Sequence, residues 1–389
     1  MRVSKSFNQR GPDLYLSTPF LRTMKLHLLI PSLFWPDDSL PEIYRDLPLP
    51  ALETLLAKSL RTEDESSGIE AWLCHAFGIE EQHDWPVAPI TLQTDGGGQL
   101  TAGNHYWLRA DPVHLRIEHN QIVLADSQIF QITSEETNQF TDLLNHHFAE
   151  DSYGLTSGNS DITKQRPVLL PLAPDRWYLH VAETPTLKTH ALSTVSGRNI
   201  NSFLPSGEDG IQWQKYFNEI QMLLYEHPLN LAREARGELA INGIWFWGGG
   251  TMPQSINSPY TQVWANAVLP QSLALANATS HADLPPTAAA WRQSATTGSH
   301  LAILDTLSSR AQYDNAYGWR ENLKKLELEW FGPLLIALKQ GELEKLTITT
   351  IDDRSSKNFS ITSHDLWKFW RAAKPLTTYA TCDRDCRVN

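Results

Sequence analysis

The chain has 389 residues, of which 41% are hydrophobic, and its 32 Lys and Arg against 44 Asp and Glu give a formal charge of -12. This length suits one large domain or two smaller ones. The negative charge argues against nucleic acid as a partner, because a protein that neutralises phosphates needs a basic face. No stretch approaches the roughly 18 consecutive apolar residues that span a bilayer, so we expect no membrane partner. Three cysteines cannot form a disulfide framework, which favours a reducing compartment and a cytoplasmic location.

The two ends of the chain differ in composition from the rest. Residues 1–23 contain basic residues but no apolar core of the signal-peptide type, so we expect an extension, with Met24 as the natural start. Residues 377–389 are expected to form a polar tail. Its Cys382 and Cys386 have C-x3-C spacing, which is a weaker metal signal than C-x2-C and indicates two incidental thiols.

Taken in chain order, the hydrophobic pattern predicts strands that alternate with helices at both ends of the chain and a mixed region between them. In the first part we expect a buried strand at 26–30, a helix at 51–60, a charged loop at 62–68 and a helix at 69–77. In the middle we expect strands at 105–117, 121–125 and 176–182 and helices at 135–149 and 212–226. In the last part we expect strands at 241–247, 301–305 and 343–351, a connector at 285–300, a helix at 318–339 and an amphipathic segment at 365–373.

This order indicates an α/β fold in which a mostly parallel sheet is covered by helices on both faces. Residues 24–84 and 236–376 are expected to form this core in two pieces, and residues 85–235 to form an inserted α+β lid domain.

A Gly-rich segment follows one of the expected strands. The residues after Gly248–Gly250 complete neither GxxxxGK[ST] nor GxGxxG, so a nucleotide-binding loop is not indicated. We interpret these glycines as a place where the backbone passes close to another group.

Two clusters of polar residues are the strongest candidates for a binding site. The first lies in a strand-like segment, where Arg109 and Asp111 share one face and His114 and Arg116 share the other. The second cluster lies on a short helix that is expected to begin at Pro228. The polar residues of this cluster are His227, Asn230, Arg233 and Arg236. Guanidinium groups suit phosphate and carboxylate, so both clusters are candidates for binding a small phosphorylated or carboxylate ligand. The alternative is a buried network of ion pairs that joins two domains, and composition does not separate the two.

The segment NEIQMLLYEHPLNLAREARGELAINGIWFWGGG at 218–250 resembles cofactor-independent phosphoglycerate mutases of the archaeal type. The shared features are an Asn-Glu helix, a His-Pro-x-Asn-x-x-Arg turn and a strand that ends in a Gly-rich loop. Residues 24–376 as a whole look still closer to a bacterial group of RpfE-type regulatory proteins, through the segments LHLLIPSLFWP, LPALETLL, WLRADPVHLR and DLWKFWR. The resemblance implies a core of the alkaline phosphatase superfamily with an inserted lid domain.

The resemblance also implies two divalent cations, a pair of Mn or Zn ions, and a serine that accepts the phosphoryl group. A serine hydroxyl is a poor nucleophile unless a cation lowers its pKa, and the charge of the phosphate needs two cations close together. In this chain Pro31 and Ser32 stand where the mutases have Asp-Gly. Ser32 and Ser67 are the weak candidates for the nucleophile.

The expected cation ligands are also incomplete. A late Asp-x-x-x-His pair would fall near Asp305, where no histidine follows at that spacing. The expected Asp-His pair reads Asp353-Arg354, and a guanidinium group cannot ligate a cation. His364 is the remaining late candidate, so Asp305, Asp353 and His364 are the weak metal candidates. The pattern indicates a degenerate metal site, and we expect no cofactor.

Three hypotheses follow. The first is a mutase-like protein that has lost two-metal chemistry and has a regulatory or anion-binding role, with Arg109, Arg116, Arg233 and Arg236 lining a cleft between core and lid. The second is an active mutase or phosphoesterase with shifted ligands, drawn from Asp37, Asp38, Asp305, Asp353 and His364. The third is an interaction protein whose Trp-rich surface is functional, since Trp367, Phe369 and Trp370 straddle two faces of their segment.

Overall fold

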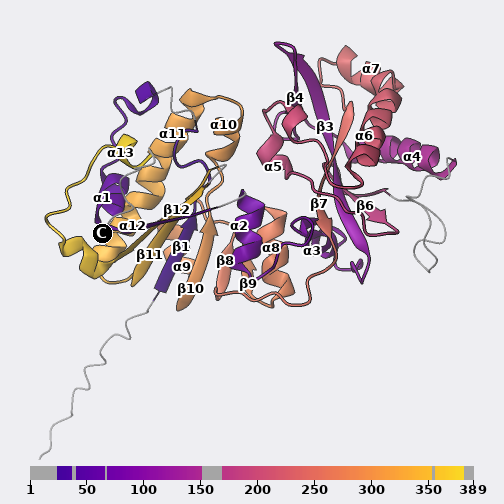
Figure 1. Ribbon diagram of the computed structural model, residues 1–389. Helices are drawn as coiled ribbons and strands as arrows, with labels where there is room; N and C mark the ends of the chain where they lie inside the picture. The colour runs from indigo at the N-terminus through magenta and orange to yellow at the C-terminus, as the bar shows by residue number, and fades with distance from the viewer. Residues whose placement is uncertain (1–23, 37–40, 66–67, 151–168, 353–354, 381–389) are drawn as a thin grey trace, which may run out of the picture.

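The computed structural model describes residues 24–36, 41–65, 68–150, 169–352 and 355–380, and these form two β-sheets with helices packed against and between them (Figure 1). The expected extension at 1–23 and most of the expected tail lie outside the described residues. Within the described part of the chain, no helix combines the length and apolar character needed to cross a membrane.

The first sheet has seven strands in the order β2-β12-β11-β1-β10-β8-β9. Their bounds are β1 (Met24–Leu29), β2 (Leu60–Glu65), β8 (Gln262–Trp264), β9 (Ser280–Ala282), β10 (Gly298–Ile303), β11 (Lys345–Ile351) and β12 (Ser355–Thr362). The pairs that join β11, β1, β10, β8 and β9 are parallel, whereas β12 and β2 are antiparallel to their neighbours. The predicted α/β class with a mostly parallel sheet is confirmed.

Helices cover both faces of this sheet, as predicted. One layer contains α1 (Pro50–Lys58), α9 (Ala288–Ser294), α11 (Ala316–Leu326) and α12 (Gly332–Lys339), and the other contains α2 (Ile69–Ala76) and α8 (Val268–Ala276). The helix α3 (Val87–Asp95) packs against α8 and against β3 and β7 of the second sheet. Alternate strand residues face opposite layers. Leu301 and Ile303 pack with α2 and α8, whereas Ala302 packs with α1 and α11.

The helix expected at 318–339 is interrupted by a π-helical turn at Glu327–Phe331. The Glu327 carboxylate there accepts hydrogen bonds from the backbone N–H groups of Ala51 at 2.6 Å and Leu52 at 3.1 Å. These amides belong to the first turn of α1, whose N-cap residue Leu49 makes no side-chain cap. The irregular turn therefore places a carboxylate on the unsatisfied N-terminus of a neighbouring helix.

The second sheet is antiparallel and is centred on the long strand β3 (Tyr106–Glu118). Its other strands are β4 (Gln121–Ala125), β5 (Leu169–Ala173), β6 (Arg176–Val181) and β7 (Gly243–Gly250). Around it lie α4 (Ser134–Glu150), α5 (Leu192–Val195), α6 (Gly210–Tyr225) and α7 (Pro228–Ala235), with a 3-10 turn at Ile200–Ser202. Figure 1 shows α2, α3 and α8 between the two sheets.

The placement of β7 differs from the predicted domain boundaries, which assigned residues 236–376 to the core. In the structure β7 pairs with β3, with Asp111 opposite Trp245 and Arg109 opposite Trp247. All eight residues of β7 are buried. A strand buried on both faces has the same continuous apolar pattern in either sheet, so its sequence does not reveal which sheet it joins.

Three other segments depart from the predicted elements. The charged loop expected at 62–68 begins as strand β2, which forms the edge of the first sheet beside β12, where a charged strand is favoured. The connector expected at 285–300 contains α9 and the start of β10. The segment expected to be amphipathic at 365–373 begins in a short 3-10 helix, Ser363–Trp367, and continues as turns. A further 3-10 turn at Pro41–Tyr44 and the short helices α10 (Ser308–Gln312) and α13 (Thr377–Ala380) complete the described elements.

Candidate functional site

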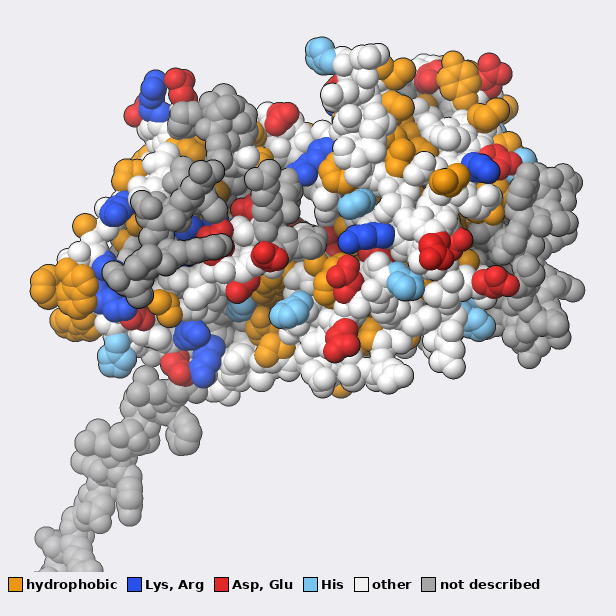
Figure 2. Space-filling view, viewed as in Figure 1, with side chains coloured by type: hydrophobic (Ala, Val, Ile, Leu, Met, Phe, Trp, Pro, Cys, Tyr) orange, Lys and Arg blue, Asp and Glu red, His pale blue; other side chains and the backbone are white. Residues whose placement is uncertain are grey.

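The two halves of the molecule meet through a polar contact at the carboxyl edge of the first sheet. Tyr313, which follows α10, donates a hydrogen bond from its hydroxyl to Asp126 at 2.7 Å. The other carboxylate oxygen of Asp126 accepts one from Ser196 at 2.7 Å. Gln312 donates its side-chain amide to the carbonyl of Ser193 at 2.6 Å. Figure 2 shows a notch between the two halves, with acidic and basic side chains on its walls.

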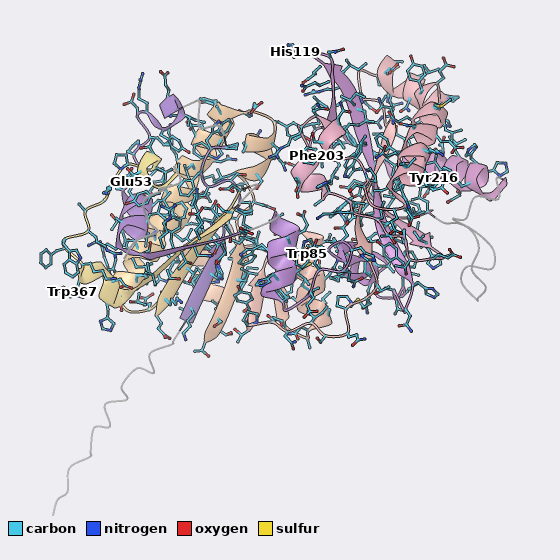
Figure 3. All side chains as sticks on the ribbon, viewed as in Figure 1. Glu53, Trp85, His119, Phe203, Tyr216 and Trp367 are labelled. Carbon is cyan, nitrogen blue, oxygen red and sulfur yellow. The ribbon has the colours of Figure 1, made fainter. Side chains whose placement is uncertain are left out.

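A cavity of about 160 Å³ lies at the junction of the two halves. It is lined by the first turn of α2, the loop before α3, the end of β7 and the segment before α5; its polar side chains are Glu70, Glu81, Asp84, Lys188, Thr189, His190 and Thr194. Trp85 and Trp247 provide its aromatic walls, and Trp85 is labelled near the centre of Figure 3. Its concave shape, mixed polar lining and aromatic walls are those of a small-molecule site.

Two carboxyl groups in this cavity are removed from water. Asp84 is buried and accepts hydrogen bonds from the Thr189 hydroxyl and from the backbone N–H of Trp85, the latter at 2.8 Å. Burial raises the pKa of Asp84 to about 6. Glu70 accepts a hydrogen bond from the Ser193 hydroxyl at 2.8 Å, and burial raises its pKa as well. Burial therefore favours the protonated form of both carboxyl groups relative to an exposed carboxyl group.

One cation, Lys188, and an imidazole, His190, lie in the same cavity. Lys188 is exposed, and His190 has its pKa lowered by burial and by the charge of Lys188. The cavity thus offers hydrogen-bond acceptors at Glu70 and Asp84 and a positive charge at Lys188. This combination suits a small ligand that carries both hydroxyl groups and a negative charge.

The sequence did not predict these cavity residues. Glu70 opens a helix and Asp84 precedes a Trp-Pro pair, and neither belongs to a motif with a recognisable spacing. Their association depends on the packing of α2 against the segment before α5, which brings Glu70 to Ser193 although 123 positions separate them in the chain.

The Gly-rich segment passes close to neighbouring groups, and this confirms its interpretation from sequence. Gly248 has φ +65°, a left-handed conformation that favours glycine. A Cβ atom at Gly249 would collide with the Tyr106 hydroxyl, and one at Gly250 would lie 2.6 Å from the Cβ of Pro86. The glycines allow the end of β7 to pack closely at the wall of the cavity.

The first predicted anion-binding cluster is a buried ion pair. Arg109 and Asp111 are 3% and 1% exposed, and the guanidinium donates to both carboxylate oxygens at 2.9 Å. The carboxylate also accepts from the Trp247 indole at 2.8 Å and the Trp177 backbone N–H at 3.1 Å. The guanidinium lies over the rings of Tyr178 and Trp247, with its carbon 5.0 and 5.2 Å from their centroids. These groups are satisfied within the protein, which corrects their prediction as anion ligands.

The remaining residues of the first cluster also have internal partners. His114 makes a 2.8 Å hydrogen bond between Nδ1 and the carbonyl of Ala240. Arg116 forms an ion pair with Glu118 at 2.8 Å, on the surface of β3. Since β3 places His114 and Arg116 on a different face from Arg109, the four side chains do not converge on one ligand.

The second predicted cluster holds α7 in place. Asn230 is buried and bridges the carbonyls of Leu224 and Ile241, and it accepts from the backbone N–H of Ile241. His227 caps α7 by accepting from the backbone N–H of Leu229. The His-Pro-x-Asn-x-x-Arg turn therefore joins α6, α7 and β7.

The two arginines of this cluster share one acid. Arg233 is 1% exposed and donates to Glu136 at 2.8 Å and to the carbonyls of Leu239 and Gln131. Arg236 donates to the second oxygen of Glu136 at 2.8 Å and to Glu238. The structure thus shows an ion-pair network at this position, but the network lies within the second half and does not join the two halves as the alternative expected.

The weak metal candidates do not assemble at one place. Ser32 and Asp305 follow the parallel neighbours β1 and β10, so both lie at the carboxyl edge of the first sheet. His364 follows β12, whose last residue, Thr362, is opposite Lys345, the first residue of β11. His364 is therefore at the amino edge, about 20 Å away along β11. This corrects its prediction as a metal ligand together with Asp305.

Other predicted candidates lie outside the described residues, namely Asp37, Asp38, Ser67, Asp353 and Arg354. Among the residues that are described, no group of three or more His, Cys, Asp or Glu side chains is arranged to hold a metal ion. The described side chains therefore do not fit a pair of Mn or Zn ions.

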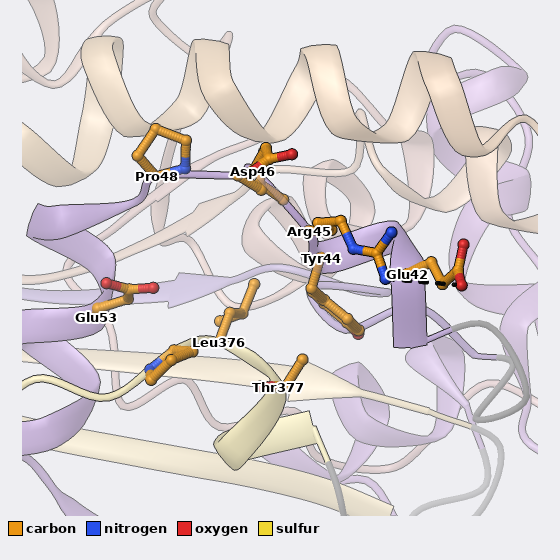
Figure 4. Close-up of a pocket in the computed structure, with 10 residues that line it drawn as sticks. Glu42, Tyr44, Arg45, Asp46, Pro48, Glu53, Leu376 and Thr377 are labelled. Atoms are coloured by element: carbon orange, nitrogen blue, oxygen red, sulfur yellow. Dashed lines mark ion pairs between the residues drawn. The ribbon is translucent and has the colours of Figure 1, made fainter.

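A larger groove of about 820 Å³ runs along the surface beside α1 and the segment 375–377 (Figure 4). Its charged residues Glu42 and Arg45 form an ion pair with each other at 3.8 Å. Because α1 lies on the opposite face of the sheet from α2, this groove is separate from the cavity at the junction.

Comparison with known proteins finds sequence similarity to 2,3-bisphosphoglycerate-independent phosphoglycerate mutases. The chain is 29% identical over 138 residues to that of Methanosarcina barkeri, covering 36% of this chain and 31% of the relative. It is 34% identical over 73 residues to that of Methanosarcina mazei, covering 19% of this chain and 18% of the relative. The matches thus span less than a third of the relatives' length. No protein-family profile matches the chain.

Among solved structures, a protein of Pyrococcus horikoshii matches with a TM-score of 0.47 and 13% identity, over 88% of this chain and 87% of that one. The cofactor-independent phosphoglycerate mutase of Thermoplasma acidophilum matches with a TM-score of 0.42 and 13% identity, over 87% and 90%. The resemblance to phosphoglycerate mutases that the sequence indicated is confirmed at the level of partial sequence similarity.

Proposed function

We propose that this chain is a non-catalytic relative of the cofactor-independent phosphoglycerate mutases, with a core related to the alkaline phosphatase superfamily and a degenerate metal site. In this proposal it acts in the cytoplasm as a regulatory protein of the RpfE type. It binds a small hydroxy acid or its phosphate ester in the cavity between its two halves.

One observation carries the non-catalytic part of the proposal. Two-metal phosphoryl transfer needs carboxylate and imidazole groups that converge on two ions. Within the described ranges no such group exists, and the fold places Asp305 and His364 at opposite edges of the sheet. The residues that resemble the mutases around 218–250 serve packing, because Asn230 and Arg233 are engaged inside the protein.

The ligand class follows from the cavity. The carboxyl groups of Glu70 and Asp84 can accept hydrogen bonds from ligand hydroxyls, and Lys188 can pair with a carboxylate or phosphate. In this proposal the anion is bound by Lys188 at the junction of the two halves, and not by the arginines that the sequence indicated.

A second candidate is an active mutase, and the sequence similarity to mutases favours it. Of the ligands expected for it, Asp305 and His364 lie at opposite edges of the sheet, whereas Asp37, Asp38 and Asp353 lie outside the described residues, as does the candidate nucleophile Ser67. In that case the Mn or Zn pair would lower the pKa of the serine hydroxyl and neutralise the phosphate.

Two measurements test the proposal. The purified chain is analysed for bound metal and assayed for conversion of 3-phosphoglycerate with and without added Mn or Zn. We expect no stoichiometric metal and no turnover, and stoichiometric metal with turnover would establish the second candidate instead. Binding of glycerate and of 2- and 3-phosphoglycerate is then measured by calorimetry.

Variants locate the ligand. We expect Lys188→Ala and Glu70→Ala to weaken binding about tenfold or more, because each removes one polar contact. Arg116→Ala is the matched control, since Arg116 is a partly exposed arginine outside the cavity. Equal loss in Arg116→Ala, or no binding of any of the three ligands, contradicts the proposed site.

A further inference from the structure

An exposed aromatic group lies on the opposite edge of the first sheet from the cavity. Trp367, Phe369 and Trp370 are 79%, 87% and 68% exposed. We call these three residues the aromatic tip. Figure 2 shows an orange group that projects at the outer margin of the molecule, and Figure 3 labels Trp367 there. Three large rings in water within four positions are unusual for a soluble surface, and they mark a contact site.

The segment that carries the aromatic tip is held firmly to the sheet. Asp365 accepts hydrogen bonds from the backbone N–H and the hydroxyl of Thr362 at 2.8 and 2.7 Å. Lys58, at the end of α1, donates its ammonium to the carbonyls of Leu366 and Lys368, both at 3.0 Å. The exposure of the rings therefore reflects a defined backbone conformation and not a frayed end.

A further contact comes from the residue between α1 and β2. Arg371 donates to the carbonyl of Ser59 at 2.7 Å, next to β2. Phe369 and Trp370 contact each other edge to face, with ring centroids 5.1 Å apart. The rings thus pack against each other on a rigid base and leave their outer surfaces in water.

Positive charge surrounds the aromatic tip. Residues 364–374 contain three cations, Lys368, Arg371 and Lys374, and one carboxylate, Asp365, whereas the whole chain has a formal charge of -12. Lys368 pairs with Asp365 at 2.5 Å, so the segment keeps a net positive charge through Arg371 and Lys374. Lys58 adds a fourth cation through its contacts with this segment. In Figure 2 blue side chains lie directly beside the projecting orange group. A locally basic patch on an acidic protein is complementary to an anionic surface.

We propose that the aromatic tip and its cations bind the surface of a membrane that contains anionic lipids. Tryptophan and phenylalanine rings partition into the interface between headgroups and acyl chains, and flanking Lys and Arg side chains pair with lipid phosphates. The tip projects from the molecule, and a bilayer accommodates a projecting group without a matching concave partner. The sequence predicted no membrane partner because no stretch is long and apolar enough to span a bilayer. Binding at the membrane surface needs no spanning segment, so that observation does not argue against it.

The test measures partition of the full chain onto vesicles. Vesicles of phosphatidylglycerol and phosphatidylcholine in equal amounts are compared with pure phosphatidylcholine vesicles at low salt. We expect binding to the anionic vesicles and at least about tenfold weaker binding to the neutral ones. Replacing all three rings, in Trp367→Ser/Phe369→Ser/Trp370→Ser, should lower the partition coefficient on anionic vesicles about tenfold or more.

A matched control separates the tip from general surface hydrophobicity. Tyr317→Ser and Met222→Ser remove side chains that are 76% and 80% exposed elsewhere on the molecule, and they should bind as the unaltered chain does. Circular dichroism checks that the triple variant folds, and Lys374→Glu provides a second variant that leaves the rings and their base intact. We expect Lys374→Glu to weaken binding to anionic vesicles only.

Two outcomes overturn the proposal. One is equal partition of the unaltered chain and the triple variant. The other is an unaltered chain that does not bind vesicles and is a dimer in light scattering, whereas the triple variant is a monomer. The aromatic tip would then be a contact between two copies of the chain.

Discussion

The hydroxyl of Tyr313 donates a 2.7 Å hydrogen bond to Oδ1 of Asp126, and this bond joins the helical cover of the first sheet to the end of β4 in the second. Asp126 is 4% exposed, and its other oxygen accepts from Ser196. The preceding residue, Gln312, donates its side-chain amide to the carbonyl of Ser193, between the cavity residues Ala191 and Thr194, so this contact region helps to hold the two halves together beside the cavity.

Removing this hydroxyl should loosen the junction. We expect Tyr313→Phe to lower the free energy of unfolding by about 1–2 kcal/mol, because a buried carboxylate loses one of its donors. Hydrogen exchange of the amides at 192–198 should become faster. Tyr317→Phe, at an exposed tyrosine, is the control and should change neither quantity. Unaltered exchange at 192–198 in Tyr313→Phe would contradict a closing role for this bond.

The Arg109–Asp111 pair should behave as a structural element. Arg109→Met leaves the Asp111 carboxylate buried without its counter-charge, so we expect a loss of about 3–5 kcal/mol in the free energy of unfolding. The double variant Arg109→Met/Asp111→Asn should lose less than the sum of the single variants, because it removes both charges. Urea denaturation measures all three. A ligand-binding role for Arg109 would instead show as weaker ligand binding with little change in stability.

The raised pKa of Asp84 should make stability depend on pH. The carboxyl has a pKa of about 6 in the folded chain against the usual 3.8, so the unfolded chain loses its proton first as the pH rises. Stability due to this group is complete below about pH 4 and is lost between pH 4 and 6. We expect Asp84→Asn to become more stable relative to the unaltered chain, by up to about 3 kcal/mol, over this interval. Asp142→Asn, at an exposed position, is the control, and equal pH profiles for all three proteins would contradict the assignment.

His27 should remain neutral in the folded chain. Its Nε2 lies 2.6 Å from the Thr349 hydroxyl, which itself donates to Asn358, so Nε2 carries the proton and Nδ1 accepts from Tyr260. Burial lowers its pKa to about 4. As the pH falls from 6.5 to 4, the unfolded chain takes up the proton first, and stability decreases. Nitrogen NMR of the imidazole should show the Nε2–H tautomer down to pH 5, and titration of His27 near pH 6 would rule out this network.

The effects of His27 and Asp84 on stability oppose each other in the same pH interval. The net dependence of the unaltered chain is therefore smaller than either contribution. For this reason each prediction is tested on the difference between a variant and the unaltered chain.

Much of the fold follows from local pattern. The apolar run at β1, the stripe of leucines in α1 and the helix α6 are all set by residues that are neighbours in the sequence. The strands β2 and β12 escaped prediction because both are rich in polar residues. The edge strand β2 pairs with β12 only through a long-range contact, and β12 lies between β2 and β11.

The residues of the candidate site, unlike these elements, could not be predicted from local pattern. The sequence offered the arginines either as ligands of an anion or as members of ion pairs, and in the structure their partners are carboxylates of the protein. Arg109 is paired within its own strand, whereas the partner of Arg233 is Glu136, 97 positions earlier. Residue type indicates that a guanidinium needs an acid or an anion, but it does not indicate which of the two is present.

The sequence by itself determined the α/β class, the order of most elements and the need for glycine at 248–250, because periodicity and backbone freedom are local properties. Only the tertiary structure decided that β7 joins the second sheet, that His364 and Asp305 stand at opposite edges, and that Glu70 and Asp84 meet in one cavity. Each of these depends on contacts between residues far apart in the chain. The burial of a side chain is decided only when the chain folds. Burial raises the pKa of Asp84, whereas the rings of the aromatic tip stay exposed to water.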